Sequence, residues 1–249
     1  MTIAIMITAI VIGSGISLTG GVILLSLRKY RKTALLLTMP FGAGALLAAS
    51  FFDLLPEAFD QLSIDGVLLY CLAGFMAFFL LERTAGWFHH HHSHEYDRMD
   101  KNINQRRLII LGDLMHNAID GLAIGASFLV SVPLGIITTL AVSSHEIPRE
   151  LGTFAMLMAK GWRNKTVLLA NVLTAVATLV AAITIYLLGD AIADIVGPLL
   201  ALTAGFFIYV AASDIIPDIH EQPRKTGTVQ ALALVVGVVA VGVAIELLH

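Results

Sequence analysis

The sequence predicts an all-α protein that crosses a membrane eight times. Of its 249 residues, 57% are hydrophobic and only 13% are charged, and the mean hydropathy is +0.86. A soluble domain of this size carries about twice that share of charge. The apolar residues fall into eight runs, each near the roughly 20 residues that a helix needs to cross a bilayer core. Almost no chain is left for a soluble domain, so residues 1–249 are expected to form a single transmembrane domain.

The eight spans are expected at residues 2–27, 33–59, 66–88, 108–130, 133–159, 166–188, 195–219 and 228–248. Only Ser131 and Val132 separate the fourth span from the fifth, so these two helices are expected to be antiparallel neighbours. The longest connection, residues 87–107, is polar. Its histidines are typical of metal binding and predict a metal-buffering or metal-sensing loop: His89, His90, His91, His92 and His94.

The orientation follows from the cations. Fourteen of the 15 Lys and Arg residues lie in the breaks after the first, third, fifth and seventh spans or, for Arg83, near the end of the third span, and only Arg149 lies deep in a span. Because Lys and Arg accumulate in cytoplasmic loops, these breaks are expected to face the cytoplasm, together with the histidine loop. Both termini are then extracytoplasmic. The compact length favours a cell membrane, plasma or inner, as the location.

A short internal repeat links the second span to the seventh. DLLPE at 53–57 is echoed by DIIPD at 214–218, in spans that run in opposite directions. Such a relation is typical of transporters built from an inverted repeat, here arranged as 3+2+3 spans. The repeat predicts carboxylates that receive the ion at the outer mouth, Asp53 and Glu57, and carboxylates that release it at the inner one, Asp214 and Asp218. Alternatively, carboxylates at helix ends simply meet interfacial water.

Polar side chains gather on one face of the fourth and of the fifth span. Residues three or four apart share a helix face. The fourth span presents such a stripe, made of Asp113, His116, Asn117 and Asp120. The fifth span presents two pairs spaced four apart, His145 with Arg149 and Glu146 with Glu150. Ionisable groups are costly inside a membrane, which favours a functional site. Imidazole with carboxylate suits Zn²⁺ and related ions, and the alternative is a polar seam that only joins the helices.

Two further features concern the backbone of these spans. Pro148 removes a helical hydrogen bond and frees a carbonyl about one turn earlier, near Ser144. That carbonyl could offer an ion another oxygen, or the proline could merely kink the helix. Gly121 and Gly125 form a GxxxG pair, which predicts close packing of the fourth span against a neighbour.

Three stretches resemble one known family. LMHNAIDGLAIGASF, HEIPRELGTFAMLMAKG and GAGALLAASFFDLLPEAF are similar to the fourth, fifth and second spans of the ZIP (Zrt/Irt-like protein) metal transporters. The resemblance covers essentially the whole chain. It implies uptake of Zn²⁺ first, with Fe²⁺, Mn²⁺ or Cd²⁺ as further substrates, through a two-ion site. The ligands it implies are His116, Asn117, Asp120, His145 and Glu146, with Asp120 bridging.

Arg149 and Asp53 depart from the pattern that the resemblance implies. Many members have His, Glu or Gln, a metal ligand, where this chain has Arg149, and many have His where it has Asp53. Guanidinium stays protonated and cannot ligate a cation, so Arg149 must pair with carboxylates. The candidates are Asp120, Glu146 and Glu150. We hypothesise that Arg149 takes the place of the second ion, leaving one ion held mainly by His116 and Asp120 with help from the fifth span. Arg149, Glu150 and Asp113 are expected to modulate the site.

The function that follows is metal uptake into the cytoplasm by alternating access. An intramembrane zinc enzyme is the main alternative, but it needs HExxH, and the second histidine position is Arg149. We therefore expect no enzyme, and no cofactor besides the transported ion. Export or metal sensing on the same fold is the other alternative. The expected partners are the divalent ion and the lipid bilayer, a homodimer is left open, and no basic aromatic surface indicates nucleic acid.

Overall fold

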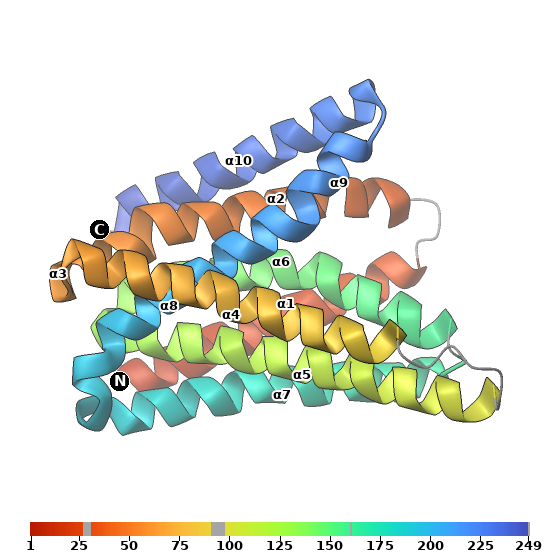
Figure 1. Ribbon diagram of the computed structural model, residues 1–249, viewed down its shortest axis with the longest axis horizontal. Helices are drawn as coiled ribbons and strands as arrows, with labels where there is room; N and C mark the ends of the chain where they lie inside the picture. Colours follow the sequence, from red (N-terminus) through yellow and green to blue (C-terminus); the bar gives the residue numbers. More distant parts are fainter. Residues whose placement is uncertain (27–30, 91–97, 160, 249) are drawn as a thin grey trace.

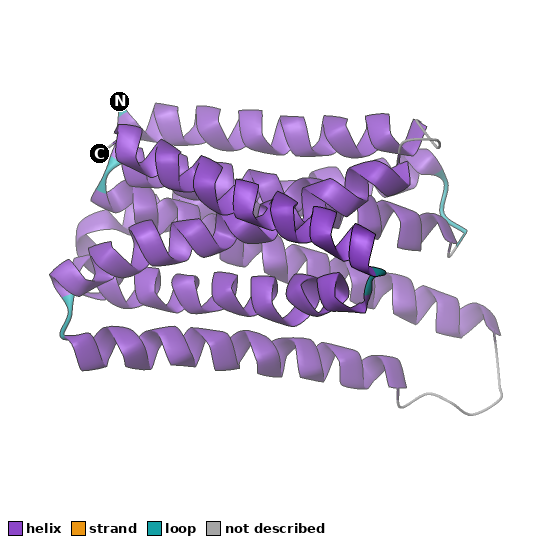
Figure 2. Ribbon diagram, turned by 90° about the horizontal axis from the view of Figure 1, so that it is seen from above, coloured by secondary structure: helices purple, strands orange, loops and turns teal. Residues whose placement is uncertain are grey.

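Long helices lying side by side make up the described part of the chain (Figures 1 and 2). The structure, a computed structural model, describes residues 1–26, 31–90, 98–159 and 161–248. In chain order its elements are α1 (Thr2–Ser26), α2 (Arg31–Ala49), η1 (Ser50–Leu54), α3 (Leu55–Gln61), α4 (Ile64–His90), α5 (Arg98–Val130), α6 (Val132–Ala159), α7 (Asn164–Leu188), η2 (Gly189–Ile195), α8 (Val196–Val210), η3 (Ala211–Ile215), α9 (Ile216–Glu221) and α10 (Arg224–Leu248). Both views place the N- and C-termini at the same end of the molecule.

Each expected span corresponds to one helix or to a run of consecutive helices. The second span is α2, η1 and α3 in sequence, and the seventh is η2, α8, η3 and α9. The expected connection at 87–107 differs from the structure, because α4 continues to His90 and α5 begins at Arg98. A polar sequence does not end a helix when its residues are good helix formers, as Arg, Lys, Gln and Met are here.

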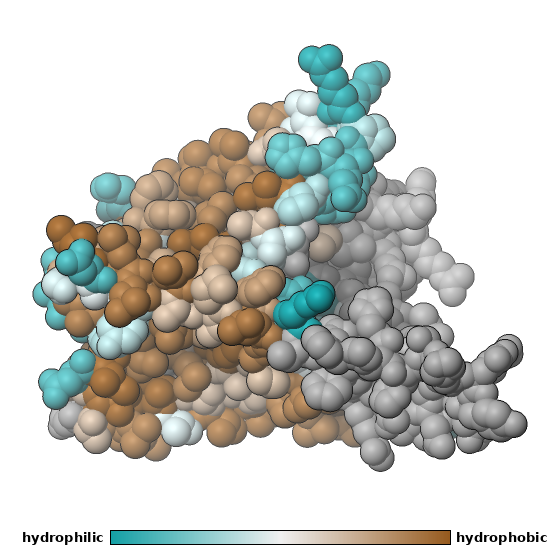
Figure 3. Space-filling view, viewed as in Figure 1, coloured by the Kyte–Doolittle hydropathy of each residue, from teal (hydrophilic) through white to brown (hydrophobic). Residues whose placement is uncertain are grey.

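The hydropathy of the helices confirms an all-α, multi-pass membrane protein. Among the described residues, six stretches are long and apolar enough to cross a membrane: Thr2–Gly20, Leu36–Gln61, Ile64–Arg83, Asn164–Leu188, Ala191–Glu221 and Arg224–Leu248. The face seen in Figure 3 is hydrophobic across its middle, with hydrophilic residues over the turn between α9 and α10. The α6 helix adds only the shorter stretch Val132–Ile147, and α5 adds none.

The helices pack in four pairs: α1 with α6, α5 with α7, α2 with α10 and α4 with α8. Glycines let the last two pairs approach closely. Gly44 of α2 meets the backbone of α10, and Gly237 of α10 meets the backbone of α2 at Phe41. In the same way Gly74 of α4 meets Leu202 of α8, and Gly205 of α8 meets the backbone of α4. Small residues at such contacts allow backbone-to-backbone packing within a membrane.

The two copies of the short repeat share a local distortion. The Leu55 N–H bonds to the Ser50 carbonyl in η1, and the Ile216 N–H bonds to the Ala211 carbonyl in η3, so each is a π-helical turn. Each turn is followed by a proline in the first turn of the next helix. A proline has no N–H to give to the carbonyl four residues earlier, so the helix widens there. The repeat therefore encodes the same backbone feature in both halves of the chain.

Candidate metal centre

The antiparallel pair α5 and α6 carries the centre. Ser131 alone joins them, and its hydroxyl accepts a hydrogen bond from the Leu134 N–H, which caps the start of α6. Near this turn the Thr138 hydroxyl of α6 donates to the Ser127 hydroxyl of α5 at 2.9 Å. Gly135 lies against the ring of Phe128, where any larger residue would push the helices apart. The short turn and these contacts fix which residues of the two helices face each other.

Four side chains converge from the two helices: His116 and Asp120 from α5, and His145 and Glu146 from α6. His116 Nε2 lies 3.1 Å from His145 Nε2 and 3.6 Å from Asp120 Oδ2. Glu146 Oε1 is 3.9 Å from the His116 nitrogen and 3.5 Å from the His145 nitrogen. His145 Nε2 is also 3.6 Å from Asp120 Oδ2. The stripes predicted on the two helices thus meet in one cluster.

These separations match a tetrahedral zinc site. Zinc binds imidazole nitrogen and carboxylate oxygen at about 2.0–2.2 Å, which puts two ligands of a tetrahedron about 3.3–3.5 Å apart. Five of the six separations within the cluster run from 3.1 to 3.9 Å. Asp120, His145 and Glu146 are buried, and Asp120 Oδ2 has no hydrogen-bond partner among the described residues. A buried carboxylate oxygen in that state calls for a cation.

Other helices hold the two imidazoles in place. The His116 ring stands edge-on to Phe78 of α4, with the centroids 5.6 Å apart, and the His145 ring lies 6.3 Å from that of Phe207 in α8. Gly42 of α2 packs on the backbone of α6, where a Cβ would lie 2.8 Å from His145 Cα and 3.0 Å from the Ser144 carbonyl. That carbonyl, which Pro148 was expected to free, therefore lies against α2. These neighbours leave the imidazoles little freedom to turn.

Arg149 is tied to two carboxylates. Its Nε and Nη2 donate to the two oxygens of Glu146 at 2.5 and 2.7 Å, and its Nη1 donates to Asp113. Of the three expected partners of Arg149, Glu146 is confirmed. The second carboxylate that Arg149 contacts is Asp113 and not Asp120 or Glu150. Asp113 precedes His116 by three residues and Arg149 follows His145 by four, so in antiparallel helices both lie towards the same end. Asp120 lies towards the opposite end of α5.

Asn117 stands apart from the four-residue cluster. Its amide nitrogen donates to the Asp113 carbonyl at 3.0 Å, and its side-chain oxygen accepts from the Thr178 hydroxyl of α7 at 2.9 Å. On the helix it lies beside His116 but is turned towards α7, which packs closely because Gly121 and Gly125 meet its backbone. The close packing predicted from these glycines is confirmed. The Asn117 amide therefore lies at the seam between α5 and α7.

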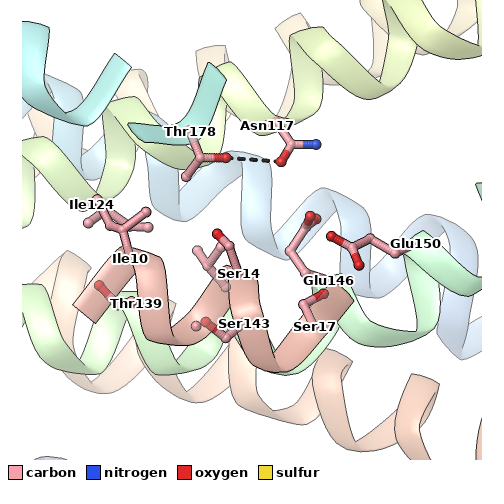
Figure 4. Close-up of a pocket in the computed structure, with 12 residues that line it drawn as sticks. Ile10, Ser14, Ser17, Asn117, Ile124, Thr139, Ser143, Glu146, Glu150 and Thr178 are labelled. Atoms are coloured by element: carbon pink, nitrogen blue, oxygen red, sulfur yellow. Dashed lines mark hydrogen bonds between the residues drawn. The ribbon is translucent and has the colours of Figure 1, made fainter. Parts of the chain in front are cut away.

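Glu150 faces α1 instead of the cluster. Together with Glu146 and Ser17 it lines an open cavity of about 300 Å³ between α1, α5, α6 and α7. Figure 4 shows the carboxylates of Glu146 and Glu150 and the Ser17 side chain at one end of this cavity, with Asn117 and Thr178 beyond. The cavity and the ligand cluster therefore share Glu146 as a common wall.

Among the described side chains, no carboxylate of the short repeat belongs to the four-residue cluster. Asp53 is buried within η1 and not at the surface, while Glu57 is half-buried and accepts a hydrogen bond from Gln61 at 3.1 Å. Asp218 is exposed in α9. The side chain of Asp214 lies outside the described residues. The same holds for the loop histidines, His89, His90, His91, His92 and His94.

A family comparison decides what the cluster belongs to. The family model described as ZIP Zinc transporter matches residues 3–108 and 89–245, which together cover nearly the whole chain. The chain belongs to the ZIP family. The expectation drawn from the three sequence stretches is thereby confirmed.

Several curated relatives of this ZIP protein match about half of its length. The zinc transporter foi of Drosophila melanogaster is 39% identical over 141 residues, and human zinc transporter ZIP6 is 39% identical over 143 residues. Human zinc transporter SLC39A7 is 41% identical over 137 residues. The matches cover 57%, 55% and 52% of this chain and 19%, 19% and 29% of the relatives. The chain thus spans less than a third of the length of these relatives.

Sequence reasoning did not find the residues that support the ligands. Phe78, Phe207 and Gly42 read as ordinary apolar or small residues of their spans, and only the packing of α2, α4 and α8 shows that they contact the histidines. The sequence also did not predict that Thr178 would bond to Asn117. Its polar character in an apolar helix was the one available signal, because a buried hydroxyl needs a partner.

Proposed function

We propose that this ZIP protein carries divalent transition-metal ions, Zn²⁺ first, across the membrane into the cytoplasm. The observation that carries the proposal is the cluster of His116, Asp120, His145 and Glu146, whose ligand atoms all lie within 4.8 Å of one another. Two imidazoles and two carboxylates suit Zn²⁺ and, with less preference, Fe²⁺, Mn²⁺ or Cd²⁺. The names of the relatives, all zinc transporters, point to the same substrate.

The centre holds one ion at a time in this proposal, because Arg149 fills the neighbouring position with a fixed positive charge. Its guanidinium engages both oxygens of Glu146 and also Asp113. A second divalent ion near Asp113 would have to displace this guanidinium, and the displaced charge would remain beside it. Asn117 stays outside the ligand set because Thr178 and the Asp113 carbonyl occupy its amide.

Alternating access arises in this proposal from two inverted halves that flank α5 and α6. Three features support the inverted repeat. The pairs α1–α6 and α7–α5 are equivalent under it, and so are α2–α10 and α8–α4. Both copies of the short repeat also form a π-helical turn. The distribution of Lys and Arg supplies the orientation, in which Asp53 and Glu57 lie on the outer side and Asp214 and Asp218 on the inner side. The inward direction of transport rests on the resemblance to the ZIP family.

The geometry favours transport over catalysis. A catalytic zinc keeps an open position for water beside three protein ligands, whereas this cluster offers four ligand atoms within 4.8 Å of one another. The family and the names of the relatives support a transporter that is not an enzyme. Metal export and metal sensing would use the same ligands. Export differs from uptake in the direction in which the ion moves, and sensing differs in what ion binding causes.

Uptake of radioactive zinc by proteoliposomes tests the proposal. We expect saturable zinc uptake by the wild type, a loss of at least tenfold in His145→Ala and in Asp120→Asn, and no change in Glu246→Gln, whose exposed carboxylate lies in α10. Sidedness is read by chelating zinc on either face. Zinc uptake that is unaffected by both cluster substitutions would overturn the site. Zinc that leaves the compartment corresponding to the cytoplasm would overturn the direction.

A further inference from the structure

The cavity between α1 and α6 contains a buried acid that the zinc centre does not use. Glu150 is 3% exposed, and Ser17 opposite it is 1% exposed. Within the described part of the chain, neither Glu150 Oε2 nor Ser17 Oγ makes a hydrogen bond of ordinary geometry, although Ser17 lies near enough to the Glu150 carboxylate to interact with it. Both line the cavity and point into it from α6 and α1 (Figure 4). Leaving such groups unpaired in a buried place costs free energy, so the cavity is suited to a ligand that both can bind.

The donor atoms around this cavity are all oxygens. Besides the carboxylate of Glu150 there are the hydroxyls of Ser14, Ser17 and Ser143, and the carboxylate of Glu146 borders the cavity. The histidines of the zinc centre do not line it. Oxygen donors without nitrogen or sulfur select hard cations over zinc and its neighbours.

The charge count favours a monovalent ion. With all four carboxylates ionised and the histidines neutral, Asp113, Asp120, Glu146 and Glu150 together with the guanidinium of Arg149 would give the region a net charge of −3. One divalent substrate, as in the proposed function on which this count rests, reduces it to −1. A single monovalent cation beside Glu150 then brings the region to neutrality, whereas a second divalent ion would leave it positive. Uncompensated charge away from water is costly, so neutrality is favoured.

We infer that the cavity between α1 and α6 is a second cation site, in which Glu150 and Ser17 bind a monovalent, oxygen-liganded cation separately from the transported metal. Glu150 supplies the charge, and Ser17 supplies a hydroxyl from the facing helix. Because the site lies between α1 and α6 and shares Glu146 with the zinc centre, an ion bound there reinforces the contact between α1 and α6, one of the two helices that carry the substrate ligands.

Equilibrium binding of radioactive sodium to the purified, metal-free, full-length protein tests this inference, with potassium as competitor and N-methylglucamine as the inert cation. The wild type should bind one sodium ion per protomer, displaced by excess sodium or by potassium. Glu150→Gln should weaken sodium binding by at least tenfold. Ser17→Ala, which removes one neutral ligand, should weaken it by about three- to tenfold. Glu246→Gln should leave it unchanged.

Zinc binding to the same preparations shows whether a variant that does not bind sodium has lost only the sodium site or is misfolded. Glu150→Gln that binds zinc normally but not sodium supports the inference. Equal sodium binding by the wild type and a zinc-competent Glu150→Gln would overturn it, and so would a zinc-competent wild type that binds neither sodium nor potassium. The sodium measurement uses no zinc, so a failure of the transport proposal leaves its result readable on its own.

Discussion

Neutralising Arg149 while keeping its bulk should tighten zinc binding. In Arg149→Met the guanidinium that engages Glu146 is removed, and both oxygens of Glu146 become free for a metal. Asp113 also loses its positive partner and adds negative charge near the centre. Every electrostatic consequence of the substitution therefore favours a bound cation.

The expected size follows from the distances. Arg149 Nε lies 2.5 Å from Glu146 Oε1, and zinc on that oxygen would lie about 2.0–2.2 Å beyond it, so the two charges are within about 5 Å. At an effective dielectric constant of about 20, a divalent ion and a unit charge at that distance repel by about 6–7 kcal/mol. Rearrangement of the freed carboxylates reduces this gain, but only about 1.4 kcal/mol of it has to remain for a tenfold lower Kd.

Competition with a chelator measures the zinc Kd of each purified variant, and proteoliposome uptake measures turnover. We expect Arg149→Met to bind zinc at least tenfold more tightly and to transport it more slowly, because release becomes harder. Arg149→Lys keeps the charge and should keep the Kd within a few-fold. Arg163→Met, at the exposed start of α7, is the matched control and should change neither quantity.

Breaking the pair also destabilises the metal-free protein, because Asp113 and Glu146 remain buried and charged. Removing one partner of a buried pair typically costs about 3–5 kcal/mol. Thermal unfolding should therefore show a larger stabilisation by zinc in Arg149→Met than in the wild type. A folded Arg149→Met protein with an unchanged or higher zinc Kd would refute the role given to this arginine.

Three further substitutions test how the centre is supported. Gly42→Leu should force α2 away from His145 and lower zinc affinity at least tenfold, whereas Gly15→Leu, with open space around it, should not; equal affinities would contradict the role of Gly42. Thr178→Val should lower thermal stability by about 1 kcal/mol without changing the number of zinc ions bound, since Asn117 serves the helix seam; a changed zinc count would place Asn117 among the ligands. Replacing the loop histidines at 89–94 by serine should leave the zinc KM unchanged in proteoliposomes and lower zinc binding only at high metal; a raised KM would assign the loop a role in transport.

The sequence predicted the fold well because the membrane restricts a spanning chain to a few structures. Each expected span coincides with a helix or a run of helices. The α5 helix begins at Arg98, ten residues before its expected start at 108. The π-helical turns could not be foreseen, since a proline also permits a kink or an ordinary helix start. They depend on how the surrounding helices pack.

For the site, helical spacing identified which residues share a face but not their rotation towards particular neighbours. Asp113 was assigned to the stripe, yet its pairing with Arg149 depends on the register of α5 against α6. Asn117 is adjacent to a ligand in sequence but turned to α7 in space. The rotation of each helix is set by contacts such as Gly121 on α7 and Gly42 on α6, which connect spans far apart in the sequence.

The central claim, a single transported ion held by two histidines and two carboxylates, is tested most directly on the purified wild type. Metal analysis of the zinc-loaded protein gives the stoichiometry, and X-ray absorption at the zinc edge gives the ligands. With the loop histidines replaced, we predict one zinc per protomer with two imidazole nitrogens and two oxygens at about 2.0–2.2 Å, and two ions in Arg149→His. Two zinc ions per wild-type protomer, or a spectrum without imidazole, would contradict the account.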